Sequence, residues 1–288
     1  MSLYLNKSFN ASNYQSFRPT YPQSLYERIM QYHRLHRGTV VDVGCGTGIA
    51  TFPLVKYFEK VIGCDPSAKM IQTAEEQRQA LEDVQKDRIE FKIIPAEKIS
   101  SVIPEKSADM IVCAEAIQWV NLAVFFEMAS SILKPGGTLA YWMYADPIFL
   151  DYPEANEVFR SFVYEDPKYY ASYWPPEMQY VRNLGKTIVI PEDKFQDITG
   201  EVYNPLNSDK KTAFSIAQDD FTIQKLKNWL RTWSIYLKWQ EDNRDTNVDI
   251  TDLLVEKLRE KCGWDENTKI RIEWQTCYYL ARNRTTSS

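Results

Sequence analysis

A short strand that runs directly into a glycine-rich turn constrains this chain more than any other feature. Residues 40–43, three valines and Asp42, form a segment of strand length, and Gly44, Gly46 and Gly48 follow at alternate positions. Glycine has no Cβ, so the backbone at Gly44 and Gly46 can approach a ligand closely. In open α/β sheets, ligands bind beyond the carboxyl ends of the strands, where this turn has to lie. The segment therefore predicts an α/β fold with a binding site at the turn.

Strands and helices alternate along residues 39–142, which indicates a parallel sheet. Short apolar runs predict strands at 39–43, 61–64, 89–94, 109–113 and 138–142. Amphipathic stretches predict helices at 49–57, 68–81 and 122–133, the last with Asn121 as its N-cap. Strands joined by helices in this rhythm pair in parallel through right-handed crossovers. We therefore expect an α/β fold with a mostly parallel, doubly wound sheet.

The residues around the turn indicate which ligand it binds. Asp65 ends the second predicted strand, 21 residues after Gly44, where a carboxylate can accept hydrogen bonds from both ribose hydroxyls. The glycine spacing is G-x-G-x-G, whereas a dinucleotide turn needs G-x-G-x-x-G to place a pyrophosphate at the helix amino end. Asp42, just before the turn, disfavours a pyrophosphate and suits a sulfonium ligand that carries an ammonium group. The pattern favours S-adenosylmethionine (SAM) over a nicotinamide dinucleotide.

Several motifs resemble those of the class I SAM-dependent methyltransferases. Residues 42–48 resemble the first motif of that family, residues 95–97 the loop after its third strand, and residues 114–119 and 133–138 its later motifs. Residues 13–22 and 231–234 more narrowly resemble the trans-aconitate methyltransferase branch. Within that branch the chain is most similar to the cantharidin-detoxifying methyltransferase. The resemblance implies a Rossmann-like fold, with a helical and aromatic cover over the active site, and an enzyme that methylates a small molecule.

The resemblance also implies a cofactor role for each matching residue. Gly44, Cys45 and Gly46 are expected to face the methionine part of SAM, and Asp65 its ribose, with Asp42 beside the turn. The remaining expected contacts are Pro66 and Met70 on one side of the adenine, Ala96 and Glu97 on the other, Ala114 at the SAM amine, and Tyr14 and Arg18 at the SAM carboxylate or the acceptor.

The acceptor is expected near the ends of the fourth and fifth strands. Four residues that follow these ends should rim a pocket, namely Gln118, Trp119, Trp142 and Tyr144. A polycarboxylate needs a cation, and arginine binds carboxylates through paired hydrogen bonds. Arg231 is the candidate, because it shares a predicted helix with Trp229 and Trp233, and Trp233 joins it in the expected site. We expect methyl transfer to a carboxylate oxygen of a small di- or tricarboxylic acid, which needs no catalytic base because the carboxylate is already ionised.

The second half of the chain breaks the strand–helix rhythm. Residues 146–195 are rich in Pro, Tyr and Asp, whereas helices are predicted at 223–239 and 249–261 and a strand at 270–280. We expect one methyltransferase domain over 1–282, followed by a tail at 283–288. Its parts are an N-terminal cover (1–36), a SAM-binding half (37–145), an insertion over the acceptor pocket (146–195), and the remaining strands and cover helices (196–282).

The amino-acid composition indicates which kinds of binding partner the chain can have. A net charge of −5 and the lack of a long basic run argue against a nucleic-acid partner. Five cysteines without CxxC spacing, and only two histidines, favour free thiols in a reducing compartment and no metal site. Without a signal pattern or a long apolar run, we expect a cytoplasmic protein with no membrane partner. The alternatives are the same fold acting on a lipid-like acid or nitrogen acceptor, an NAD-dependent oxidoreductase, and a non-catalytic SAM-binding protein.

Overall fold

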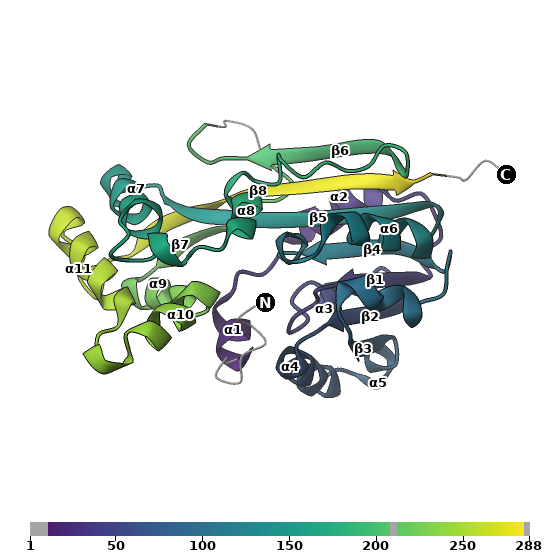
Figure 1. Cartoon of the computed structure of the whole chain (residues 1–288), viewed down its shortest axis with the longest axis horizontal. Coiled ribbons are helices and arrows are strands. Elements are labelled where there is room, and N and C mark those ends of the chain that lie inside the picture. Colours follow the sequence, from purple (N-terminus) through teal and green to yellow (C-terminus); the bar gives the residue numbers. More distant parts are fainter. Residues whose placement is uncertain (1–10, 208–211, 285–288) are drawn as a thin grey trace.

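An eight-stranded sheet forms the centre of the structure (Figure 1). The structure, a computed structural model, describes residues 11–207 and 212–284. The strand order is β3-β2-β1-β4-β5-β8-β6, and β7 pairs with β8 outside this path. The strands are β1 (Thr39–Val43), β2 (Lys60–Asp65), β3 (Ile89–Ile93), β4 (Ala108–Ala114), β5 (Leu133–Phe149), β6 (Phe195–Tyr203), β7 (Ala217–Phe221) and β8 (Ile270–Asn283).

The strands β1 to β5 pair in parallel, so the expected doubly wound α/β fold is confirmed. Parallel strands are apolar on both faces because helices cover both. In β1 the neighbours Val40 and Val41 are both fully buried, but they point into two different hydrophobic clusters on opposite faces of the sheet. The antiparallel strands β8, β6 and β7 extend the sheet beyond β5. The strand predicted at 270–280 is part of β8.

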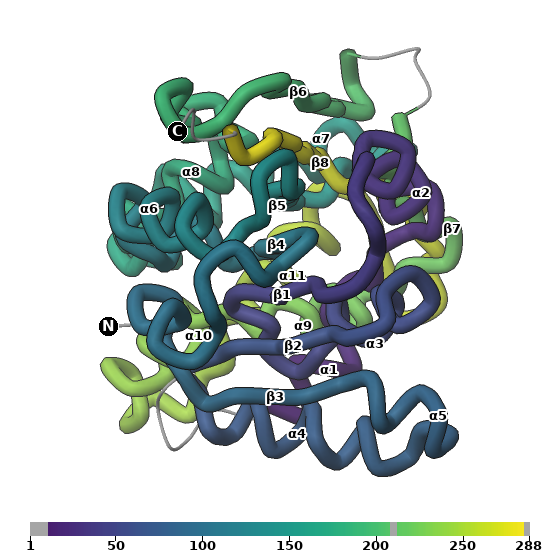
Figure 2. The backbone as a smooth tube through the Cα atoms, turned by 90° about the vertical axis from the view of Figure 1, so that its right-hand side faces the viewer, coloured from purple at the N-terminus to yellow at the C-terminus, as the bar shows by residue number. Residues whose placement is uncertain are grey.

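Helices cover the two faces of the sheet, as the view along the sheet in Figure 2 shows. On one face lie α2 (Gln23–Tyr32) and α3 (Thr51–Leu54), and on the other lie α6 (Leu122–Ile132) and α8 (Gln179–Arg182). Near the β3 edge lie α4 (Ala68–Gln79) and α5 (Asp83–Lys86). Asn121 caps α6 as predicted, because its side chain accepts a hydrogen bond from the Val124 N–H.

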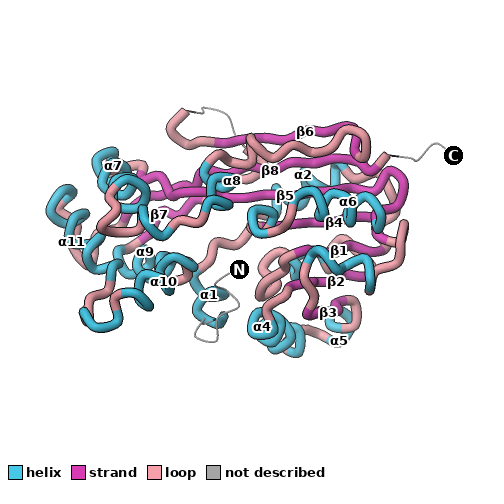
Figure 3. The backbone as a smooth tube through the Cα atoms, viewed as in Figure 1, coloured by secondary structure: helices cyan, strands magenta, loops and turns pink. Residues whose placement is uncertain are grey.

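A group of helices gathers beyond the carboxyl ends of the strands (Figure 3). It consists of α7 (Pro153–Arg160), α9 (Ile223–Leu230), α10 (Ser234–Asp242) and α11 (Ile250–Cys262). The helix α1 (Ala11–Phe17) contacts both α9 and α4, so it connects this group to the sheet (Figure 1). Helices therefore cover the edge of the sheet at which ligands bind in open α/β folds.

Three predicted elements differ from the structure. The strand predicted at 138–142 extends to Leu133–Phe149, because pairing with β8 continues past Tyr144. The helix predicted at 49–57 is assigned only at Thr51–Leu54, and residues 55–57 continue it through tighter i to i−3 hydrogen bonds.

The helix predicted at 223–239 is two helices, α9 and α10. At the break the Thr232 hydroxyl donates to the Trp229 carbonyl, a side-chain bond that competes with the helical backbone pattern. The predicted tail begins one residue later than expected, since Asn283 belongs to β8, and residues 285–288 lie outside the described part.

Candidate functional site

The glycine turn after β1 is held against the end of β2. The backbone N–H groups of Gly44 and Cys45 both donate to the Cys64 carbonyl, at 2.8 and 3.1 Å. Gly44 has φ of +70° and Gly46 has φ of +55°, a region that glycine enters without steric cost. The turn therefore crosses the carboxyl ends of the central strands with its backbone exposed to a cavity.

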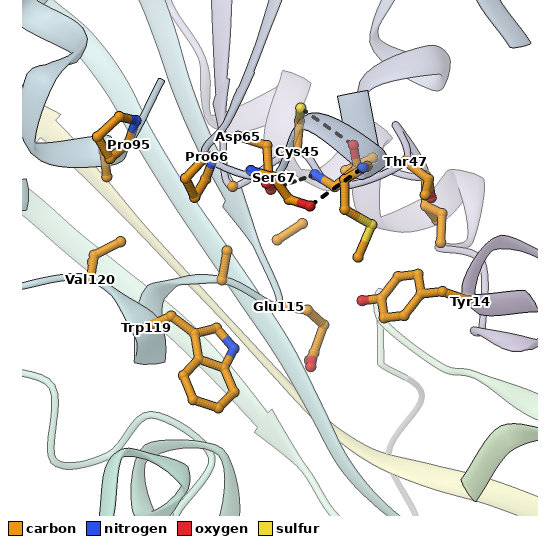
Figure 4. Close-up of a pocket in the computed structure, with 18 of the residues that line it drawn as sticks. Tyr14, Cys45, Thr47, Asp65, Pro66, Ser67, Pro95, Glu115, Trp119 and Val120 are labelled. Atoms are coloured by element: carbon orange, nitrogen blue, oxygen red, sulfur yellow. Dashed lines mark hydrogen bonds between the residues drawn. The ribbon is translucent and has the colours of Figure 1, made fainter. Parts of the chain in front are cut away.

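Asp65, the last residue of β2, fixes the same turn. Its Oδ2 accepts a hydrogen bond from Gly46 N at 3.0 Å, and its Oδ1 accepts one from Ser67 N at 2.8 Å (Figure 4). Burial raises the pKa of Asp65, and these two bonds lower it. The carboxylate predicted to meet a ribose thus also shapes the turn.

A cavity of about 300 Å³, the first cavity, lies between the turn and the residues that follow β2, β3 and β4. Ten of the twelve predicted cofactor residues line it, namely Tyr14, Gly44, Cys45, Gly46, Asp65, Pro66, Met70, Ala96, Glu97 and Ala114. Residues that sequence reasoning did not assign also line it, among them Tyr21, Thr47, Ser67 and Glu115.

Asp42 does not line the first cavity, which corrects its predicted place. Its side chain is fully buried in β1, and its Oδ2 accepts a hydrogen bond from the Thr51 hydroxyl at 2.6 Å. Burial raises the pKa of Asp42 to about 7, although the bond from Thr51 lowers it. Asp42 thus joins β1 to α3 beneath the turn.

A second cavity of about 60 Å³ shares Tyr14, Glu115 and Trp119 with the first. In Figure 4 these three side chains project into the space from different sides. Four more of the predicted residues line the second cavity: Arg18, Gln118, Tyr144 and Trp233. Arg18, predicted with the cofactor residues, lies only here among the two cavities, where its Nη1 donates to the Tyr144 hydroxyl at 3.1 Å.

Trp142 and Arg231 lie outside both cavities, contrary to expectation. Trp142 is fully buried in the middle of β5, edge to face with Tyr21 at 5.4 Å, because the strand continues well past it.

Arg231 ends α9, and its Nε and Nη2 both donate to Asp249 Oδ2, at 3.0 and 2.7 Å. Trp229, in α9, and Trp233, the N-cap of α10, do line the second cavity, but Arg231 lies at the break between the two helices and binds Asp249 instead.

The segment 146–195 supplies three polar residues of the second cavity that the sequence did not single out. The Tyr164 hydroxyl donates to Asp146 Oδ1 at 2.6 Å, and the Arg182 guanidinium lies 4.0 Å above the Tyr164 ring. Burial raises the pKa of Asp146 to about 6, while the Tyr164 bond and the Arg182 charge lower it. No periodic pattern marks these residues, and only the richness of the segment in Pro, Tyr and Asp indicated a cover.

The described residues contain no group of three or more potential metal ligands. Within the same residues, no helix is long and apolar enough to cross a membrane.

Comparisons with known proteins agree in one activity. Residues 41–141 match a family model described as a methyltransferase domain. The chain is 38% identical to a probable S-adenosylmethionine-dependent methyltransferase from Saccharomyces cerevisiae, over 98% of both chains. It is 32% identical to a methyltransferase from Claviceps purpurea, over 94% of this chain and 86% of the relative.

Solved structures share the fold. A proposed type II methyltransferase from Anaeromyxobacter dehalogenans superposes with a TM-score of 0.67 at 24% identity, over 92% of this chain and 98% of that one. A phosphoethanolamine N-methyltransferase from Haemonchus contortus, in complex with S-adenosyl-L-methionine, gives a TM-score of 0.51 at 16% identity, over 99% of this chain and 60% of that one.

Proposed function

Because this chain belongs to the class I S-adenosylmethionine-dependent methyltransferases, we propose that it transfers a methyl group to a carboxylate oxygen of a small di- or tricarboxylic acid. The acceptor is held in the second cavity. The observation that carries the proposal is the wall that the two cavities share, with Arg18 and Arg182 on the side of the second.

The first cavity has the shape and chemistry that SAM requires. A Cβ at Gly46 would meet no atom within 4 Å, so the backbone there is open to a ligand. The carboxylate of Asp65 suits ribose hydroxyls, and Pro66 and Met70 offer an apolar wall to an adenine. We assign the methionine part to Gly44–Gly46 and the amine to the Ala114 backbone.

The second cavity combines cations with aromatic rings. Arg18 comes from the segment after α1, and Arg182 from the end of α8. Guanidinium groups bind carboxylates through paired, charge-assisted hydrogen bonds, which suits an acceptor with more than one carboxylate. The Trp233 ring contacts the rings of both Trp174 and Trp229, and the three rings form an apolar wall.

The two segments that resemble the trans-aconitate methyltransferase branch meet at this cavity, which supports placing the chain there. Tyr14 and Arg18 lie in residues 13–22, and Trp233 and Ser234 lie in residues 231–234, and all four line the second cavity. We propose on this ground that the chain belongs to that branch and is related to the cantharidin-detoxifying methyltransferase.

Methyl transfer to a carboxylate requires the protein mainly to position the two reactants. Bound SAM supplies an activated methyl group on a positively charged sulfur. The residues of the shared wall have to bring the acceptor oxygen to roughly 3–3.5 Å from that methyl group and keep water out. A carboxylate acceptor is ionised at neutral pH, so no general base is assigned.

An amine acceptor is the second candidate, because two partly buried carboxyl groups also line the second cavity. Asp146 and Glu115 face it among aromatic rings, a setting that suits a cation. The two arginines favour the acid, since they would repel an ammonium group.

Radiolabelled methyl transfer distinguishes these candidates. The protein is incubated with SAM tritiated in the methyl group and with di- and tricarboxylic acids, long-chain acids or amines. A methyl ester releases volatile methanol in mild base, whereas an N-methyl product keeps its label. We expect base-labile product from small polycarboxylic acids. Label that stays with an amine would refute the carboxylate proposal.

A further inference from the structure

Glu115 is the one carboxylate among the three residues that line both cavities. It follows β4, the strand next to β1 in the sheet. Its Oε1 accepts a hydrogen bond from the Tyr144 backbone N–H, which orients the side chain. Figure 4 shows its carboxyl group between the Tyr14 ring and the Trp119 ring.

The backbone of Glu115 is held in an unusual conformation. Its φ is +51°, a left-handed region that costs a residue with a Cβ about 1 kcal/mol or more. Glu115 N donates to the Trp142 carbonyl at 3.0 Å, and the Glu115 carbonyl accepts from Gln118 Nε2 at 2.9 Å. These bonds hold the strained residue where its carboxyl group faces both cavities.

Burial, a backbone hydrogen bond and a nearby cation act together on this carboxyl group. Burial raises the pKa of Glu115 to about 7, and the bond from Tyr144 N and the charge of Arg18 lower it. The titratable groups that interact with it electrostatically are Arg18, Tyr21, Cys113 and Cys277. The other titratable groups that line the same two cavities are Tyr14, Cys45, Asp65, Glu97, Tyr144, Asp146, Tyr164 and Arg182. Arg18 and Arg182 carry a positive charge at neutral pH.

We propose that Glu115 makes the site prefer positively charged SAM over the uncharged sulfur of its product, S-adenosylhomocysteine. The inference rests on the proposed function only in that the acceptor occupies the second cavity. A methyl group that passes between the cavities has to cross their shared wall, so the charged sulfur comes near Glu115.

The physical reason is a change of charge during the reaction. SAM carries a positive sulfur, which an ionised Glu115 attracts, and S-adenosylhomocysteine carries a neutral one. An opposite charge within about 4–6 Å shifts a carboxyl pKa by roughly 1–3 units, and each unit is a factor of ten in relative affinity. Loss of the charge removes this attraction, which favours release of the product.

The same coupling moves a proton. Below neutral pH, part of the free protein carries Glu115 as the acid. When SAM binds, the O–H bond of that acid breaks and the proton goes to the buffer. S-adenosylhomocysteine has the same amino acid and adenosine groups, but its sulfur carries no positive charge. It therefore leaves the proton on Glu115. Affinity for SAM should therefore rise with pH through this range, more steeply than affinity for S-adenosylhomocysteine.

Calorimetry of the two ligands tests the inference without turnover. Titrations at about pH 6 and about pH 8, each in two buffers of different ionisation enthalpy, count the protons released. For the wild type we expect more proton release with SAM, and a ratio of SAM to S-adenosylhomocysteine affinity that rises between the two pH values.

Two variants provide the comparison. Glu115→Gln keeps the size of the side chain and an oxygen for Tyr144 N–H, and it should lower that affinity ratio on the order of tenfold at the higher pH. Asp65→Asn, at the predicted ribose contact, should weaken both ligands alike. Equal weakening of both ligands by Glu115→Gln, or a wild-type ratio that does not change with pH, would overturn the inference. Because the wild-type titration needs no variant, it can refute the inference even if Glu115→Gln fails to fold. If the protein methylates small acids but the ratio of SAM to S-adenosylhomocysteine affinity does not change with pH, this inference is refuted and the proposed function is not.

Discussion

Replacing Gly44 by alanine tests whether the glycine turn depends on the close approach of its backbone to Ala116. A Cβ at Gly44 would overlap the Cβ of Ala116, nearer than such atoms approach in real proteins. Ala116 lies in the segment between Glu115 and the short helical turn Ile117–Trp119, so it can yield only if the shared wall of the two cavities moves. Gly46→Ala is the matched control, because its Cβ meets no atom within 4 Å although its φ is also positive.

The expected cost follows from these two geometries. Left-handed backbone costs an alanine about 1–2 kcal/mol at either position. Overpacking adds about 1–3 kcal/mol, and only at Gly44. We therefore expect Gly44→Ala to lose about 2–5 kcal/mol of unfolding free energy and Gly46→Ala about 1–2 kcal/mol.

Urea unfolding of both variants measures the difference, and calorimetry with S-adenosylhomocysteine measures binding. Gly44→Ala should lose both stability and affinity, since the turn itself is displaced. Gly46→Ala should lose mainly affinity, because its methyl group projects into open space beside the first cavity. Equal losses of stability in the two variants would refute the reasoning, since only the contact with Ala116 separates them.

Three further predictions follow from the site. Arg182→Ala should raise the KM for a polycarboxylic acceptor about tenfold, because one charged hydrogen bond at a partly exposed site is lost. The affinity for S-adenosylhomocysteine should not change, and weaker binding of that ligand would contradict the assignment of Arg182 to the acceptor. Arg231→Ala should lower the unfolding free energy by about 1–2 kcal/mol, since it leaves Asp249 without its guanidinium partner. The KM for the acceptor should stay constant in steady-state kinetics, and a raised KM would return Arg231 to the acceptor site. Burial raises the pKa of Asp42 from 3.8 to about 7 in the folded protein, so the unfolded state loses its proton first and the contribution of Asp42 to stability falls as pH rises between these values. Asp42→Asn removes that dependence, and in urea unfolding the variant should gain stability relative to wild type from about pH 5 to about pH 8; a constant difference would show that Asp42 is not held as predicted.

The sequence predicted the parallel strands around the first cavity well because local patterns determine them. The strands β1 and β2 are short and mostly apolar; Gly44 directly follows β1, Asp65 ends β2, and both residues line the first cavity. Asp42 was placed wrongly, since closeness along the chain to the turn does not tell which face of β1 a side chain occupies. The structure settles this through the hydrogen bond to Thr51.

The second cavity was predicted less well, because its lining depends on how distant segments pack. Arg231 was chosen for its helical neighbours, but a break in that helix and the partner Asp249, 18 residues on, determine where its side chain points. Trp142 was expected at a strand end because nothing in the local sequence shows that β8 extends β5. Arg182, which lies in a segment without periodic pattern, was missed.

The sequence by itself determined the parallel α/β fold and the position of the glycine turn. Both depend on the alternation of apolar residues and on the freedom of glycine, which are properties of short segments. Only the tertiary structure decided which cations and rings meet at the second cavity. Arg18, Tyr144, Arg182 and Trp233 come from four separate parts of the chain. These residues come together only because α1 and the helices α7 to α11 pack against the sheet. The free energy of this packing is summed over contacts between distant segments, so no single segment of the sequence encodes it.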